Sequence, residues 1–61
     1  MKWYIVENTP KTGGMNLESF DSELEARRAM QEIINSKTDD YYDNLVALGG
    51  SLMVQDENGN G

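Results

Sequence analysis

The absence of cysteine and histidine most restricts what this chain can fold into, because the chain has only 61 residues. A domain of this size buries about 60% of the surface that its unfolded chain exposes, so its stability is marginal. Small domains often compensate with disulfides or a structural zinc ion, and neither is open to this chain. We therefore expect a small, well-packed core, an oligomer, or a fold that a partner completes.

The same absence argues against catalysis. A serine nucleophile normally needs a histidine base, and catalytic zinc needs histidine or cysteine ligands. Two-carboxylate chemistry stays formally open, but so short a chain can scarcely enclose a cleft of about 300 Å³ and keep a core. Residues 56–61 match only the first half of a calcium-binding loop. We expect a protein that is not an enzyme and that uses no metal or other cofactor.

Charge and apolar runs restrict the partners. The apolar run at residues 3–6 is too short for a signal peptide, which needs about 7–15 apolar residues, or for a membrane helix of about 20. Five Lys and Arg residues against eleven Asp and Glu residues give a formal charge of −6. Such a chain should repel nucleic acids and anionic membranes. We expect a soluble cytoplasmic protein whose natural partners are basic protein surfaces.

The first expected strand, residues 2–7, is rich in aromatic and β-branched side chains. Alternation makes both of its faces apolar, with the pairs Trp3/Ile5 and Tyr4/Val6 on opposite sides. One long helix can cover only one face of a small sheet. The second face therefore needs another cover, which residues 38–48, a second copy of the chain or a partner would supply.

Residues 15–20 predict a second strand, because Met15 and Leu17 alternate with Asn16 and Glu18. Together the two runs predict a β-hairpin. Residues 8–14 between them contain one proline and two glycines, which favour a turn. We expect these residues to form a long, mobile loop.

A helix is predicted to follow, because residues 22–25 fit the capping box in which Ser22 and Glu25 satisfy free backbone N–H groups. Its end is expected near residues 35–36. Helical spacing predicts one core-facing stripe, formed by Ala26, Ala29, Met30, Ile33 and Ile34. Leu24 falls on the opposite side. Two salt bridges within the helix are expected, namely Glu23–Arg27 and Glu25–Arg28.

Residues 38–48 are ambiguous between a short helix and a buried strand. Their apolar residues recur at helical spacing up to Gly49, which favours a helix and a glycine stop, but the run at 45–48 also suits a strand. Residues 51–55 predict a third strand. The chain is therefore an α+β protein of order ββααβ, with a three-stranded antiparallel or mixed sheet packed on the helix. Residues 1–55 form the single domain, and 56–61 a flexible polar tail.

An acidic cluster beside two tyrosines is the strongest candidate for a functional surface. Acids are favoured at any helix N-terminus, so a solvated helix start is one interpretation. The other is a contact surface, because tyrosine is enriched in binding hot spots and acids steer basic partners. Glu7, Glu18 and Glu32 would extend the cluster if the fold brings them together. The residues that we assign to partner binding are Asp39, Asp40, Tyr41, Tyr42, Asp43 and Glu32.

In size, charge and this Asp/Tyr cluster, the chain resembles small acidic phage-encoded anti-defence proteins, such as anti-CRISPR proteins and DNA mimics. The resemblance extends over the whole chain and includes no diagnostic motif. It implies a non-catalytic inhibitor that occupies a basic nucleic-acid-binding site on a CRISPR-Cas or other nuclease complex. The alternative is a small structural or regulatory module that self-associates through an uncovered sheet face. The protein would accordingly be a monomer or a homodimer.

Overall fold

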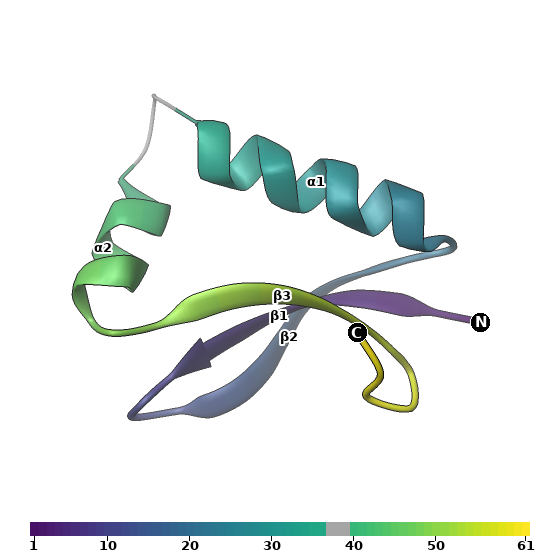
Figure 1. Cartoon of the computed structure of the whole chain (residues 1–61), viewed down its shortest axis with the longest axis horizontal. Coiled ribbons are helices and arrows are strands. Elements are labelled where there is room, and N and C mark those ends of the chain that lie inside the picture. The colour runs from purple at the N-terminus through teal and green to yellow at the C-terminus, as the bar shows by residue number, and fades with distance from the viewer. Residues whose placement is uncertain (37–39) are drawn as a thin grey trace.

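The computed structural model describes residues 1–36 and 40–61 and has the expected α+β order. Its elements are β1 (Trp3–Thr9), β2 (Gly13–Phe20), α1 (Glu23–Asn35), α2 (Tyr41–Ala47) and β3 (Ser51–Asp56). The strands form one antiparallel sheet in the order β2-β1-β3, so the first strand is central. Both helices lie on the same side of this sheet (Figure 1).

The second helix resolves the ambiguity of residues 38–48. Residues 41–47 form α2, so the helical alternative is confirmed there, while residues 37–39 lie outside the described part of the chain. Gly49 follows with a φ of +81°, a left-handed conformation that glycine adopts without strain. The helix therefore ends where the sequence predicts.

The hairpin loop is much shorter than expected. Strand β1 continues to Thr9 and β2 begins at Gly13, which leaves three residues between them, so the prediction of a long loop was wrong. The Thr9 hydroxyl accepts a hydrogen bond from the Thr12 backbone N–H at 3.0 Å. Gly13 has a φ of +67°, which lets the second strand start directly after the turn. A local hydrogen bond to a side chain thus closes a short turn where composition alone suggested a long loop.

Helix α1 begins as its capping residue predicts. The Ser22 hydroxyl accepts a hydrogen bond from the Glu25 backbone N–H at 3.2 Å. The salt bridge between Glu23 and Arg27 is present at 2.9 Å. The predicted bridge between Glu25 and Arg28 is not among the ion pairs of the described residues. The core-facing stripe is confirmed, since Ala26 is fully buried while Leu24 on the other side is 60% exposed.

The core lies mainly between the sheet and the helices. Paired strand residues point to the same side, so Ile5 shares a side with its partner Val54, and both are buried. Glu7 alternates onto this side as well, and its carboxylate accepts a hydrogen bond from Tyr41 of α2. This is therefore the helix side of the sheet. Among the described residues, the buried apolar side chains are Ile5, Val6, Ala26, Leu45 and Val54.

A β-bulge in β2 changes the side to which its residues point. Ile5 pairs with Glu18 and Val6 pairs with Asn16, so Leu17 is an extra residue in the ladder. Strict alternation predicts Asn16 and Glu18 on one face, and this was wrong because a bulge shifts the period by one residue. Glu18 consequently points to the helix side with Ile5, whereas Asn16 points away from it.

The C-terminal tail turns back on the end of β3. The Asp56 carboxylate accepts hydrogen bonds from the backbone N–H groups of Asn58 and Asn60, both at 2.9 Å. The residue that opens the partial calcium-loop pattern therefore organises a turn. The flexibility of residues 56–61 stays a prediction.

A close contact at Gly50 fixes α2 against the central strand. A Cβ atom at this position would lie 2.6 Å from the Leu45 Cδ1 atom and 2.7 Å from the Asn8 carbonyl oxygen. We predict that Gly50→Ala lowers the free energy of unfolding by about 1–3 kcal/mol, because the backbone must shift to admit the methyl group. Urea unfolding followed by circular dichroism measures this change.

Gly14→Ala is the matched control for that substitution. Its Cβ atom would approach only side-chain atoms, the nearest being the Asn8 Oδ1 atom at 3.3 Å. This variant should lose clearly less stability than Gly50→Ala. An equal loss in the two variants would show that the approach of α2 to β1 is not the cause.

Candidate acidic interface at the second helix

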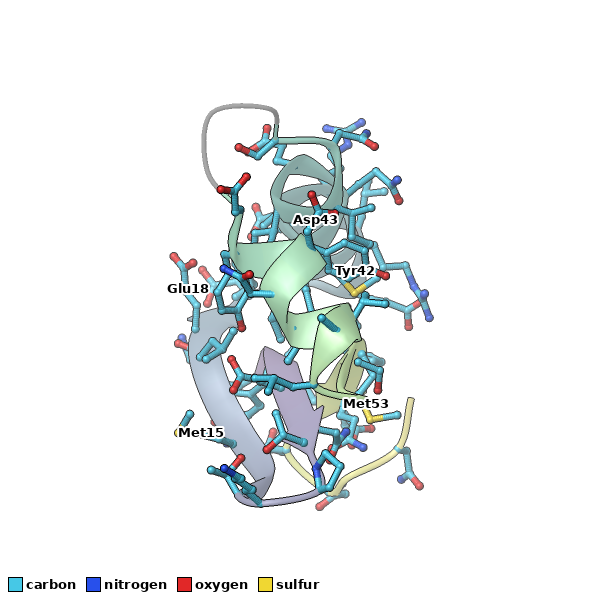
Figure 2. The ribbon with its side chains drawn as sticks, turned by 90° about the vertical axis from the view of Figure 1, so that its left-hand side faces the viewer. Met15, Glu18, Tyr42, Asp43 and Met53 are labelled. Atoms are coloured by element: carbon cyan, nitrogen blue, oxygen red, sulfur yellow. The ribbon has the colours of Figure 1, made fainter. Side chains whose placement is uncertain are left out.

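Helix α2 presents the described part of the predicted Asp/Tyr cluster. Asp40 and Asp43 are exposed and Tyr42 is half-buried. Asp40 occupies the N-cap position, yet its side chain makes no capping hydrogen bond. Figure 2 shows Tyr42 and Asp43 at the upper side of α2, toward α1 in this view. The carboxylates are therefore free to meet a partner, whereas Asp39 lies outside the described residues.

Tyr41 has a structural role in addition to its place in the cluster. The half-buried Tyr41 donates its hydroxyl hydrogen bond to the Glu7 carboxylate of β1. Burial, this hydrogen bond and the charge of Glu7 together raise the pKa of Tyr41 to about 12. Because its hydroxyl already has a partner within the fold, Tyr42 is the better placed of the two tyrosines to meet a second protein.

Two sheet carboxylates lie on the same side as α2. Glu7 and Glu18 both point to the helix side, and their positions are diagonal neighbours on adjacent strands. Such neighbours are about 7–8 Å apart. Glu18 stands at the outer edge of the sheet, on β2 (Figure 2). We call the combined set the acidic α2 surface; its members are Glu7, Glu18, Asp40, Tyr41, Tyr42 and Asp43.

The predicted site residue Glu32 is not part of this surface. It is exposed on α1, two residues after Met30 and two before Ile34. At about 100° per residue, it faces roughly the opposite way from both of these core-facing side chains. The fold therefore brings Glu7 and Glu18 toward α2 but leaves Glu32 on the outside of α1, where its partner contact stays a prediction.

The ion pairs of the described residues lie at the other end of the molecule. They join Lys2 to Asp21 and Arg27 to Glu23, each at 2.9 Å. The first of them lies near the N-terminus and the start of α1, far from α2 (Figure 1). The carboxylates of the acidic α2 surface have no cation within ion-pair distance among the described residues. Among residues 1–36 and 40–61, negative charge thus has cationic partners near the N-terminus and the start of α1 and has none at the acidic α2 surface.

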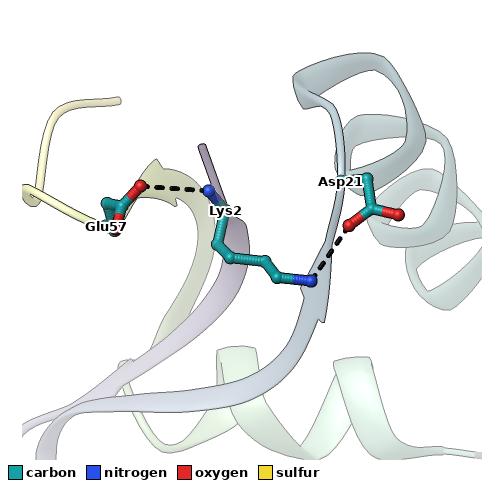
Figure 3. Close-up of polar contacts among 3 residues, drawn as sticks. All are labelled: Lys2, Asp21 and Glu57. Carbon is teal, nitrogen blue, oxygen red and sulfur yellow. Dashed lines mark hydrogen bonds and ion pairs between the residues drawn. The ribbon is translucent and has the colours of Figure 1, made fainter.

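Lys2 connects three parts of the chain near the N-terminus (Figure 3). Its ammonium group donates to Asp21, and its backbone N–H donates to the Glu57 carboxylate at 3.3 Å. The hydrogen bond and the charge of the pair raise the pKa of Lys2 and lower the pKa of Asp21. Both side chains are more than half exposed, so the pair contributes little to stability. Because Lys2 is engaged in this pair, its positive charge does not offset the carboxylates elsewhere in the molecule.

A shallow apolar cleft adjoins the acidic α2 surface. It has a volume of about 270 Å³ and lies between the hairpin turn and the end of α2; its lining residues are Glu7, Thr9, Pro10, Lys11, Thr12 and Leu48. Leu48 is 64% exposed. The volume is below the roughly 300–1,000 Å³ of small-molecule sites, but it can receive one apolar side chain. This cleft could not be predicted from the sequence, because it depends on the short hairpin turn.

Other kinds of site find little support in residues 1–36 and 40–61. No group of three or more Asp and Glu side chains there is arranged to hold a metal ion. None of the described helices has the length and apolar character needed to cross a membrane. Comparison with known protein families, curated proteins and solved structures finds no match to this chain. The resemblance to anti-defence proteins therefore stays a proposal.

The contact between Tyr41 and Glu7 predicts a pH dependence of stability. The folded protein holds the phenol proton more tightly than the unfolded chain, whose tyrosine pKa is about 10. The resulting stabilisation is fully present below pH 10 and is lost as the pH rises toward about 12. We expect the free energy of unfolding to fall over this range in the parent protein and to fall less in Tyr41→Phe.

Tyr42→Phe is the control, because it removes a neighbouring hydroxyl and leaves the bond to Glu7 intact. Urea unfolding at about pH 9 and pH 11.5 measures the difference for the three proteins. If Tyr41→Phe and the parent protein lost the same stability between these pH values, the bond to Glu7 would not be the source.

Proposed function

We propose that this protein is a non-catalytic inhibitor whose acidic α2 surface occupies a basic, nucleic-acid-binding site on another protein. The observation that carries the proposal is that the carboxylates at the α2 end have no cation within ion-pair distance in the described part of the chain. Carboxylates that lack an internal cation can accept hydrogen bonds from the Lys and Arg side chains that otherwise contact phosphates. A CRISPR-Cas or other nuclease complex is the class of partner that this chemistry fits.

The placement of Asp40 and Asp43 supports such mimicry. They are three residues apart, which puts side chains on neighbouring positions of one helix face. Glu18 adds a third negative charge from the edge of the sheet on the same side. A basic groove would therefore meet several carboxylates held by secondary structure, and fixed groups lose less entropy on binding than groups on a free tail.

Apolar contacts beside these charges support an anchored complex. Half-buried Tyr42 provides an aromatic side chain of the kind that is enriched in binding hot spots. The cleft next to Leu48 can accept an apolar side chain of the partner. The carboxylates would then steer association and fix orientation, while the aromatic and apolar contacts slow dissociation.

Displacement of DNA tests the proposal. We expect the protein to release a fluorescently labelled duplex from at least one member of a panel of purified CRISPR effector complexes and nucleases. Asp40→Asn combined with Asp43→Asn and Glu18→Gln should weaken this inhibition by about 3- to 150-fold, because each of the three exposed ion pairs contributes about 0.2–1 kcal/mol. Raising the salt from about 0.05 to 0.5 M should weaken it as well, because salt screens exposed charges.

A charge-matched control separates the surface from net charge alone. Glu25→Gln with Glu32→Gln and Glu57→Gln removes the same amount of charge outside the acidic α2 surface. This variant should inhibit nearly as well as the parent protein. Equal losses in the two triple variants would contradict a specific role of α2, and a loss confined to Glu32→Gln would move the contact to α1. Failure to displace DNA from every panel member would contradict the proposed function itself.

A further inference from the structure

The side of the sheet that faces away from the helices is covered by no helix of residues 1–36 and 40–61. Both helices lie on the opposite side (Figure 1). The tail reaches the end of β3, where a Cβ atom at Gly61 would lie 2.9 Å from the Val54 carbonyl oxygen and 4.0 Å from the Gln55 Cγ atom. We call this side the open sheet face. By register and alternation its members are Tyr4, Val6, Asn8, Gly14, Asn16, Ser19, Ser51, Met53 and Gln55.

The strand positions of the open sheet face carry no charged residue, although charged residues make up 26% of the chain. The Lys2–Asp21 ion pair flanks the face at one end, next to Tyr4. The strand carboxylates all point to the helix side of the sheet, by pairing register and alternation; they belong to Glu7, Glu18 and Asp56. The bulge at Leu17 is what turns Glu18 away. Depletion of charge is the compositional mark of the centre of a protein interface.

Apolar side chains occupy the middle of this face. Val6 lies on the central strand with only 5% of its surface exposed, and its partner Met53 is 38% exposed. Half-buried Tyr4 precedes Val6 on the same side. Methionine fills irregular gaps and adapts to a partner surface. The face therefore has an apolar centre surrounded by polar groups without charge.

The amide groups around this centre have weak partners. The side-chain NH₂ groups of Asn8 and Gln55 both donate to the Met53 sulfur, at 3.0 and 3.2 Å. A thioether is a poor acceptor compared with an oxygen atom. An amide carries a donor and an acceptor together, so amides on one copy can pair with the same amides on another.

We propose that the open sheet face is a self-association surface and that its occupant is the same face of a second copy. A two-fold dimer needs a self-complementary patch, which the methionine centre and the amide rim provide. Two copies that each carry a charge of −6 repel one another, and this face lets them meet without placing carboxylates in contact.

The size of the face sets the strength of the dimer. Three strands about 4.8 Å apart, with six residues that each rise about 3.3 Å, give roughly 300 Å² per copy. Two copies then cover roughly 600 Å², which is below the about 1,200 Å² of stable interfaces. We therefore expect a weak dimer, with a dissociation constant on the order of tens to hundreds of micromolar.

Sedimentation equilibrium from about 10 µM to 1 mM tests the proposal. The weight-average mass should rise from one chain toward two with concentration. Association should strengthen when the salt is raised from about 0.05 to 0.5 M, because screening reduces the repulsion between the two anionic copies. This is opposite in sign to the salt dependence expected for a basic partner at the acidic α2 surface, so failure of one proposal is distinguishable from failure of the other.

Met53→Glu is the most informative variant, because it places a carboxylate at the centre of the open sheet face of each copy. It should weaken association at least tenfold. Leu24→Glu adds the same charge at a more exposed apolar residue on the outside of α1 and should leave association nearly unchanged. Ser19→Glu, at an exposed position of the same face, repeats the test should Met53→Glu unfold the protein, which circular dichroism would reveal.

Three outcomes would overturn the proposal. A strict monomer at 1 mM in both salts would show that the open sheet face does not bind itself, whatever else it contacts. Equal weakening of association by Leu24→Glu and Met53→Glu would show that the added net charge, and not its position on the open sheet face, is the cause. Association that survives both face variants would place the contact elsewhere, for example at the free edge of β2.

Discussion

The burial of the central strand on both sides is the constraint on which the rest of the structure depends. Ile5 and Val6 are adjacent, so their side chains point in opposite directions, yet they are 0% and 5% exposed. Two helices cover the Ile5 side, and no helix of the described residues lies on the Val6 side. There Val6 lies between its strand partners Asn16 and Met53. A domain with five buried apolar side chains must therefore leave part of its sheet open.

A single extra residue in β2 determines how charge is distributed around this open side. Without the bulge at Leu17, Glu18 would point away from the helices and place a carboxylate on the face that contains Val6. With the bulge, Glu18 joins Glu7 on the helix side. One local irregularity thus strengthens the acidic α2 surface and keeps the opposite face uncharged, so the two candidate surfaces have a common structural origin.

The sequence predicts the elements well because their signals are local. The Ser22 cap, the helical stripe that contains Ala26 and the glycine stop after residue 48 each depend on a few neighbouring residues. The hairpin turn and the bulge depend instead on pairing between strands, and they were predicted wrongly. The candidate site follows the same division. The Asp/Tyr cluster is visible in the sequence, whereas the contact of Tyr41 with Glu7, the turned Glu18 and the cleft at Leu48 exist only after the sheet has formed.

The two proposed surfaces are compatible in one molecule because they lie on different sides of the same sheet. If two copies met through their open sheet faces, the helices would lie on the outside of the resulting four-layer arrangement, and both acidic α2 surfaces would stay accessible. A partner with two basic sites at a matching distance would then bind both copies, and the second contact would be intramolecular. Weak self-association is sufficient for this purpose, because a partner that binds two copies at once also stabilises the dimer.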